Sequence, residues 1–130
     1  HDYFKTDLSL YDSGRALQKA VLAQCPNVYL VLSGHRYNVA AVPVSFDDDG
    51  DGTAERTVYQ MIANYQAAGS EGGSGYMRFL QIDEAAGELR AYSYSPYLED
   101  YRYWDEPGTE NEKCPVDPAN EEITLPLPWA

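Results

Sequence analysis

The hydrophobic positions follow a helical period near the start of the chain. Residues 12–24 carry side chains on one face at spacings of three and four, which predicts an amphipathic helix that Asp12 or Ser13 can cap. The side chains on that face are Leu17, Ala20, Val21 and Gln24. An uninterrupted apolar run follows at residues 28–32, and it predicts a short strand buried on both faces of a layered sheet.

The pattern then changes to runs typical of β-strands. The expected strands are residues 39–46, 57–65, 76–83 and 88–95, with a closing edge strand at 123–127. An acidic loop, a glycine-rich segment at 69–75 and a tight hairpin at 83–87 join the first four. We therefore expect an antiparallel meander, whereas residues 99–122 show no period and predict a long surface excursion.

Composition and charge restrict what such a domain can bind. The chain has 130 residues, enough for one domain with a hydrophobic core, and its 44% apolar content with 12 Tyr excludes a disordered chain. A net charge of -12 disfavours nucleic acid and anionic membrane surfaces as partners but permits divalent cations. No apolar run approaches the roughly 20 residues that span a bilayer, so we expect no membrane insertion.

Two blocks of sequence carry a resemblance to a known family. They are His1-Asp2-Tyr3-Phe4, and Asn27-Val28-Tyr29-Leu30-Val31-Leu32-Ser33-Gly34-His35 after the predicted helix. Together they resemble the last two metal-binding blocks of calcineurin-like metallophosphoesterases, where a lone His ends one strand and Gly-His-x-His ends the next. Residues 57–66, 72–80 and 94–101 look like secreted bacterial members of that family, so the resemblance covers nearly the whole chain.

The resemblance implies an α/β fold, namely the C-terminal half of a four-layer α-β-β-α sandwich. Residues 1–35 would supply the helix and buried strand with a metal-site His, residues 36–98 the β meander, and residues 99–130 an irregular tail with the closing edge strand. It also implies a hydrolase of small-molecule phosphomonoesters or phosphodiesters that holds two divalent metal ions and lies at an extracellular or cell-surface location.

The same resemblance nominates the residues of the active site. By this resemblance His1 and His35 would bind one of the two metals. Apart from the resemblance, the planar guanidinium of Arg36 or Arg78 could hold a substrate phosphate. Tyr37 stands where the family motif has its second His, the ligand of the other metal.

That departure from the motif leaves several readings open. Tyr37 or Asn38 could replace the missing ligand as an oxygen donor, or Tyr37 could simply pack beside the site. The chain would then be a degenerate member that folds without catalysing.

The early ligand motifs of the family are absent from the sequence. Asp-x-His, Gly-Asp-x-x-Asp and Gly-Asn-His do not occur, and the chain starts at His1 without an initiator Met. We therefore expect that a preceding N-terminal half of the same domain supplies those ligands. The chain alone is predicted to be inactive.

The acidic loop has half of a calcium-binding signature. Counted from Asp47, carboxylates stand at positions 1, 3 and 5, Gly52 at position 6 and Glu55 at position 9. The carboxylates are those of Asp47, Asp49 and Asp51. Position 12 is Val58 instead of the usual bidentate Glu, so the alternative is a solvated hairpin loop whose residues suit the turn.

A non-catalytic function is the alternative to the phosphoesterase. The chain would then be a secreted, acidic, β-rich module that binds calcium or carbohydrate. The dense aromatic stretch could stack on sugar or nucleoside faces; it comprises Tyr92, Tyr94, Tyr97, Tyr101, Tyr103 and Trp104. Cys25 and Cys114 could form a disulfide in an oxidising compartment, which the sequence does not decide.

Overall fold

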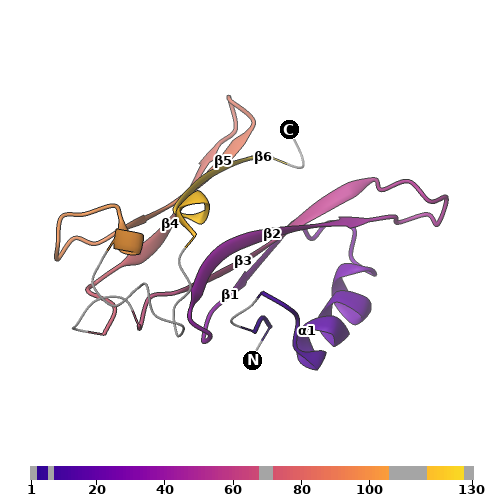
Figure 1. Cartoon of the computed structure of the whole chain (residues 1–130). Coiled ribbons are helices and arrows are strands. Elements are labelled where there is room, and N and C mark those ends of the chain that lie inside the picture. Colours follow the sequence, from indigo (N-terminus) through magenta and orange to yellow (C-terminus); the bar gives the residue numbers. More distant parts are fainter. Residues whose placement is uncertain (1–2, 6–7, 68–71, 106–116, 128–130) are drawn as a thin grey trace.

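The computed structural model describes residues 3–5, 8–67, 72–105 and 117–127, and its layers are shown in Figure 1. Its elements are helix α1 (Asp12–Leu17), the π-helical turn η1 (Gln18–Leu22), strands β1 (Leu30–Ser33), β2 (Asn38–Phe46), β3 (Arg56–Asn64), β4 (Met77–Asp83), β5 (Glu88–Tyr94) and β6 (Glu122–Pro126), and the 3-10 turns η2 (Tyr103–Asp105) and η3 (Pro118–Asn120). The predicted strands are confirmed to within two residues.

The six strands form two separate three-stranded sheets. The first has the order β1-β3-β2, with β1 parallel and β2 antiparallel to β3, and the second is the antiparallel sheet β4-β5-β6. The protein is therefore a small mixed α/β domain made mostly of strands. The predicted continuous meander is wrong, because β3 pairs with β1 and β2 and not with β4.

Strand β3 is the central strand of the first sheet and is buried on both faces. Its Tyr59 and Met61 pack against Leu89 and Ala91 of the second sheet. On the opposite face, Ile62 packs with Tyr3, Phe4 and Ala40. The N-terminal segment, the first sheet and the second sheet thus form three successive layers (Figure 1).

Strand β1 differs from the prediction of a strand buried on both faces. It lies at an edge of its sheet, and the side chain of Leu32 is 62% exposed. An apolar run predicts burial without saying which neighbour provides it, and the described residues do not cover this side of β1. The doubly buried position belongs to β3 instead.

The helix is confirmed, but it buries a different face from the predicted one. Gly14 and Leu22 are buried, whereas Leu17 and Val21 are 38% and 37% exposed. The reason is a close approach of backbones, since a Cβ on Gly14 would lie 2.5 Å from the Tyr3 carbonyl oxygen. The predicted cap is wrong as well, because Tyr11 occupies the N-cap without a side-chain hydrogen bond.

A buried polar contact holds the helix against β3. Gln18 Nε2 donates to Gln60 Oε1 at 3.0 Å, and the hydroxyl of Tyr3 donates to the same oxygen at 2.7 Å. Gln60 is fully buried, so this oxygen needs such donors in place of water. The contact turns the side of the helical segment that carries Gly14, Gln18 and Leu22 toward β3.

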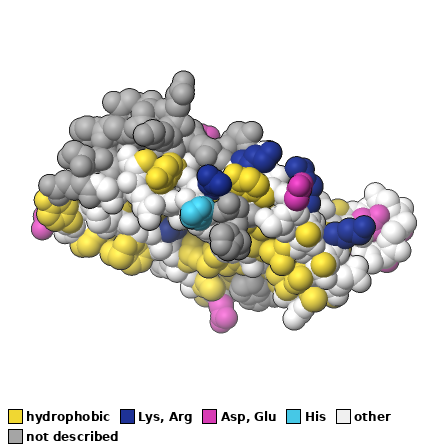
Figure 2. All heavy atoms as spheres, turned by 90° about the horizontal axis from the view of Figure 1, so that it is seen from below, with side chains coloured by type: hydrophobic (Ala, Val, Ile, Leu, Met, Phe, Trp, Pro, Cys, Tyr) yellow, Lys and Arg dark blue, Asp and Glu magenta, His cyan; other side chains and the backbone are white. Residues whose placement is uncertain are grey.

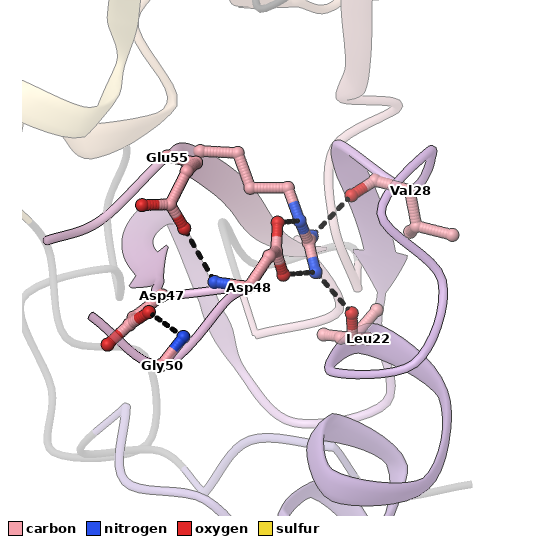
Figure 3. A network of polar contacts seen from close by, with 7 residues as sticks. Leu22, Val28, Asp47, Asp48, Gly50 and Glu55 are labelled. Carbon is pink, nitrogen blue, oxygen red and sulfur yellow. Dashed lines mark hydrogen bonds and ion pairs between the residues drawn. The ribbon is translucent and has the colours of Figure 1, made fainter. Parts of the chain in front are cut away.

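Arg56 connects the β2–β3 hairpin to the end of the helical segment. Figure 3 labels the residues that it contacts, Leu22, Val28 and Asp48. Its Nε and Nη2 donate to the two carboxylate oxygens of Asp48, at 2.6 and 2.9 Å. Nη1 donates to the carbonyl of Val28, and Nη2 also donates to the carbonyl of Leu22. The guanidinium, stacked over the Phe46 ring, thereby joins three segments of the chain.

A second polar network lies between the two sheets. Arg78 Nη1 donates to the carbonyl of Glu121 at 2.6 Å, and Nη2 donates to the carbonyl of Asn120 at 2.7 Å. The hydroxyls of Tyr65 and Ser93 are 2.6 Å apart. Burial raises the pKa of the Glu121 carboxyl to about 7, although neighbouring Ser93 and Arg78 oppose that shift. The network fixes η3 and the start of β6.

Replacing Arg56 with Ala should destabilise the fold by about 3 kcal/mol, because Asp48 and two backbone carbonyls would lose a mostly buried partner. Arg15→Ala, which removes an exposed ion pair with Asp12, should cost less than about 1 kcal/mol. Urea unfolding of both variants checks this. Equal free energies of unfolding in the two variants would contradict the role of Arg56.

Glu121→Gln should remove a pH dependence of stability. The folded-state pKa of about 7 lies above the ordinary value of 4.5, so the native state holds its proton more tightly than the unfolded chain. The wild type should lose about 3 kcal/mol relative to the variant as pH rises from 4.5 to 7. Unfolding free energies across this range measure it, with exposed Glu88→Gln as the control; parallel wild-type and Glu121→Gln curves would refute the assignment.

Candidate metal sites

His35 lies just beyond the carboxyl end of β1 and is exposed. Its φ is 73°, a left-handed conformation that is uncommon for any residue except glycine. Asn64 Nδ2, from the last residue of β3, donates to the His35 carbonyl at 2.6 Å. The adjacent strand therefore holds a strained backbone in place, as is often found at functional sites.

The imidazole of His35 is accessible instead of being enclosed among hydrocarbon side chains. In Figure 2, a histidine lies on the surface beside a basic side chain, and hydrophobic side chains lie along the same face. Because β1 and β3 are parallel, this end of the sheet is where loops converge on ligands in open α/β folds. The geometry permits a ligand role for His35.

The residues after His35 are less available to a ligand. Arg36 packs its guanidinium 5.2 Å from the centre of the Tyr11 ring. Asn38 is 6% exposed, and its Oδ1 accepts a hydrogen bond from the amide of Val39. Tyr37 is partly buried. Of the two proposed substitute donors, Tyr37 is therefore the more accessible.

Arg78 lies far along the chain from this segment, in the network between the sheets. Both of its terminal nitrogens donate to backbone carbonyls, those of Asn120 and Glu121. Since these bonds hold η3 and the start of β6, the described contacts of Arg78 are structural. They do not place it beside His35.

The acidic loop brings its carboxylates together. Four exposed residues each offer an oxygen, and these oxygens all lie within 4.8 Å of one another. The residues are Asp47, Asp49, Asp51 and Glu55. This cluster could hold a metal ion, because carboxylate oxygens are the usual ligands of hard divalent cations.

The backbone of the loop supports this convergence. Asp47 accepts hydrogen bonds from the amides of Gly50 and Gly52, at 2.6 and 2.8 Å (Figure 3 shows the former). Both glycines have positive φ, 83° and 92°, which lets the chain turn around the carboxylates. Asp48 points to Arg56 instead and leaves the cluster. Asp48 is therefore structural, whereas the other aspartates of the loop, Asp47, Asp49 and Asp51, remain candidate ligands.

The two candidate sites lie at opposite ends of the β2–β3 ladder. Asn38 pairs with Asn64 near His35, whereas Phe46 pairs with Arg56 beside the acidic loop. Eight residue steps of about 3.3 Å separate these ends, roughly 25 Å. The acidic loop therefore cannot complete a metal site at His35.

The candidate metal ligand His1 and the candidate disulfide cysteine Cys114 lie outside the described part of the chain. Cys25, the other half of the proposed disulfide, is partly buried. The ligand role of His1 and the disulfide remain predictions.

Arg56 and Asn64 were missed by the sequence analysis. They begin and end β3, and each holds one candidate site in place through a side-chain hydrogen bond. A charged or amide residue at a strand end carries no distinctive spacing. The signal that could have revealed Arg56 is its position directly after Glu55, where an Arg can pair with the excess of acidic residues.

Comparison with known proteins finds a similar region in a much longer bacterial protein. The chain is 41% identical over 105 residues, 81% of its length, to the uncharacterized protein YvnB of Bacillus subtilis (strain 168). The chain spans 8% of that relative's length. No protein-family model and no solved structure matches it. Among the described residues, no helix is long and apolar enough to cross a membrane.

Proposed function

We propose that this chain is the C-terminal part of a secreted calcineurin-like metallophosphoesterase, in which His35 binds one of two catalytic metal ions. The single observation that carries this proposal is the exposed imidazole of His35 at the tip of a parallel strand, on a backbone held by Asn64. It agrees with the sequence resemblance, which places a metal-binding His at the end of this strand. The substrate class is a small phosphomonoester or phosphodiester.

An uncovered apolar surface supports the idea that another part of the polypeptide completes the site. Leu17 and Val21 of the helix and Leu32 of β1 are all exposed. Between helix and strand lies a hollow of about 410 Å³ that these elements line. An exposed parallel edge strand is unusual, since parallel strands are normally covered on both faces. The proposed cover is a preceding segment, which would extend this sheet into a four-layer sandwich.

The length of the relative is consistent with such a segment. YvnB is more than ten times as long as the region that matches this chain. Polypeptide of that length can supply the family's missing early ligand motifs. Within a longer protein, the apolar face of α1 and β1 would then be interior instead of surface.

The chemistry assigned to this chain is limited to ligand binding. A pair of bound divalent metals would neutralise phosphate oxygens and supply a hydroxide near neutral pH. His35 would coordinate a metal through a nitrogen of its imidazole ring. The Asn64 side chain would keep the His35 backbone in its left-handed conformation. Tyr37, in place of the second His of the motif, would leave the other metal more weakly bound or shared with an oxygen donor.

His35→Ala should abolish metal-dependent hydrolysis of a chromogenic phosphodiester by the parent protein that includes the preceding segment. Loss of a ligand should lower kcat/KM by at least about 100-fold and reduce the metal content measured by mass spectrometry. Gln81→Ala, an exposed change on β4, is the control.

The isolated 130-residue chain should show no turnover in the same assay. Full activity of the His35→Ala parent with unchanged metal content would contradict the proposed ligand. Metal-dependent turnover by the isolated chain would contradict its incompleteness.

For the acidic loop, we propose calcium as the cation, in a structural role. The observation that favours it is the convergence of four exposed carboxylates within 4.8 Å, because their mutual repulsion is relieved when a cation binds. The loop connects β2 to β3 and lies beside the Asp48–Arg56 pair. A bound ion would therefore stiffen the hairpin that carries Arg56.

Calcium should raise the stability of the wild-type chain, by about 2.7 kcal/mol when its concentration is 100 times the dissociation constant. Asp49→Ala should remove this gain, because it deletes one of the converging oxygens. Asp83→Ala, in the exposed β4–β5 turn, should retain it. Calorimetric titration and thermal unfolding with and without calcium measure the effect. Absence of heat and of any shift in the wild type would reduce the loop to a turn.

A further inference from the structure

The outer face of the second sheet carries aromatic side chains that the core does not use. Along β5, Leu89, Ala91 and Ser93 are buried toward the first sheet, while Tyr92 and Tyr94 alternate with them and point outward. Phe79 of β4 pairs with Tyr92 across the strands. The face therefore presents rings to the outside.

These rings form one connected cluster. Phe79 and Tyr92 are stacked, with centroids 5.4 Å apart and planes 11° from parallel. The ring centroid of Tyr101, from the segment after β5, lies 4.6 Å from that of Tyr94 and 6.2 Å from that of Tyr92. Tyr101 remains 58% exposed despite these contacts. Its neighbours hold the ring while leaving much of its surface available.

A cleft of about 470 Å³ lies next to this cluster. Its aromatic walls are Tyr92, Tyr101 and Trp104, and its polar walls include Arg90, Arg102 and Glu122. Arg90 Nε donates to Glu122 Oε1 at 2.7 Å, so these two charges largely compensate each other. Arg102 Nη1 lies 4.0 Å from Asp105 Oδ2, so this second Arg also has an acidic partner. The cleft thus joins exposed aromatic surface to hydrogen-bonding groups whose charges are paired.

We propose that this cleft binds an uncharged pyranose ring of an oligosaccharide, stacked on Tyr101. A sugar ring has one face of C–H groups that suits an aromatic plane and a rim of hydroxyls that suits an Arg fork and a carboxylate. The pairing of Arg90 with Glu122 and the net charge of -12 disfavour an anionic ligand. This site is independent of the phosphoesterase proposal and uses none of its residues.

The test is binding of cellohexaose, mannohexaose and chitohexaose to the intact chain, followed by tryptophan fluorescence, to which Trp104 in the cleft and Trp129 both contribute, and by NMR. At least one of these neutral oligosaccharides should bind, and Tyr101→Ala should weaken binding about 10-fold through loss of the stacking plane. Tyr101→Phe keeps the ring and should bind like the wild type. Tyr97→Ala removes a Tyr that is 66% exposed but does not line the cleft, and it should also leave binding unchanged.

Thermal unfolding of each variant separates loss of the ligand site from loss of the fold.

Arg102→Ala is a second cleft variant, and it leaves the aromatic cluster in place. It should weaken binding of the same oligosaccharide. The proposal is overturned if none of the three neutral oligosaccharides binds, or if folded Tyr101→Ala binds as well as Tyr97→Ala. Binding confined to oligogalacturonate or to adenosine would overturn it too, since these probes represent anionic sugars and nucleosides.

Discussion

The structure depends on one strand, β3, which is enclosed on both faces and hydrogen-bonded along both edges. A buried backbone must find all its hydrogen-bond partners within the protein, so β3 dictates where β1 and β2 lie. Its two faces then define the two halves of the core, one against the second sheet and one against the N-terminal segment. The acidic loop lies at the start of β3, and His35 lies near its end.

The residues at the two ends of β3 form hydrogen bonds that hold the segments near the candidate sites. At the start, Arg56 binds Asp48 and the carbonyls of Leu22 and Val28, and it anchors the hairpin that carries the acidic loop. At the finish, Asn64 holds the carbonyl of His35. Such supporting contacts matter because a ligand residue is useful only when its position is fixed before the metal arrives.

The two sides of the first sheet differ in how many apolar side chains they leave exposed. The second sheet packs on Tyr59 and Met61 of β3, whereas on the opposite side of the first sheet Leu17 and Val21 of the helical segment and Leu32 of β1 are exposed. Apolar residues in such positions favour association with further polypeptide. The proposed preceding segment and the proposed oligosaccharide would occupy different surfaces, namely the β1 side of the first sheet and the outer face of the second.

The sequence by itself determined the strands, the hairpin at Gly87 and the edge position of β6. It also determined the acidic loop, whose aspartates are spaced as in a calcium-binding loop. These features depend on alternation and turn chemistry, which are local. The helix was also predictable, but its buried face was not, because the close approach at Gly14 and the Gln18–Gln60 bond involve residues distant in sequence. Only the tertiary structure decided that the strands divide into two sheets, that β3 and not β1 is enclosed, and that Arg56 and Asn64 support the candidate sites. Each of these depends on which neighbours a strand meets, and local periodicity contains no information about neighbours.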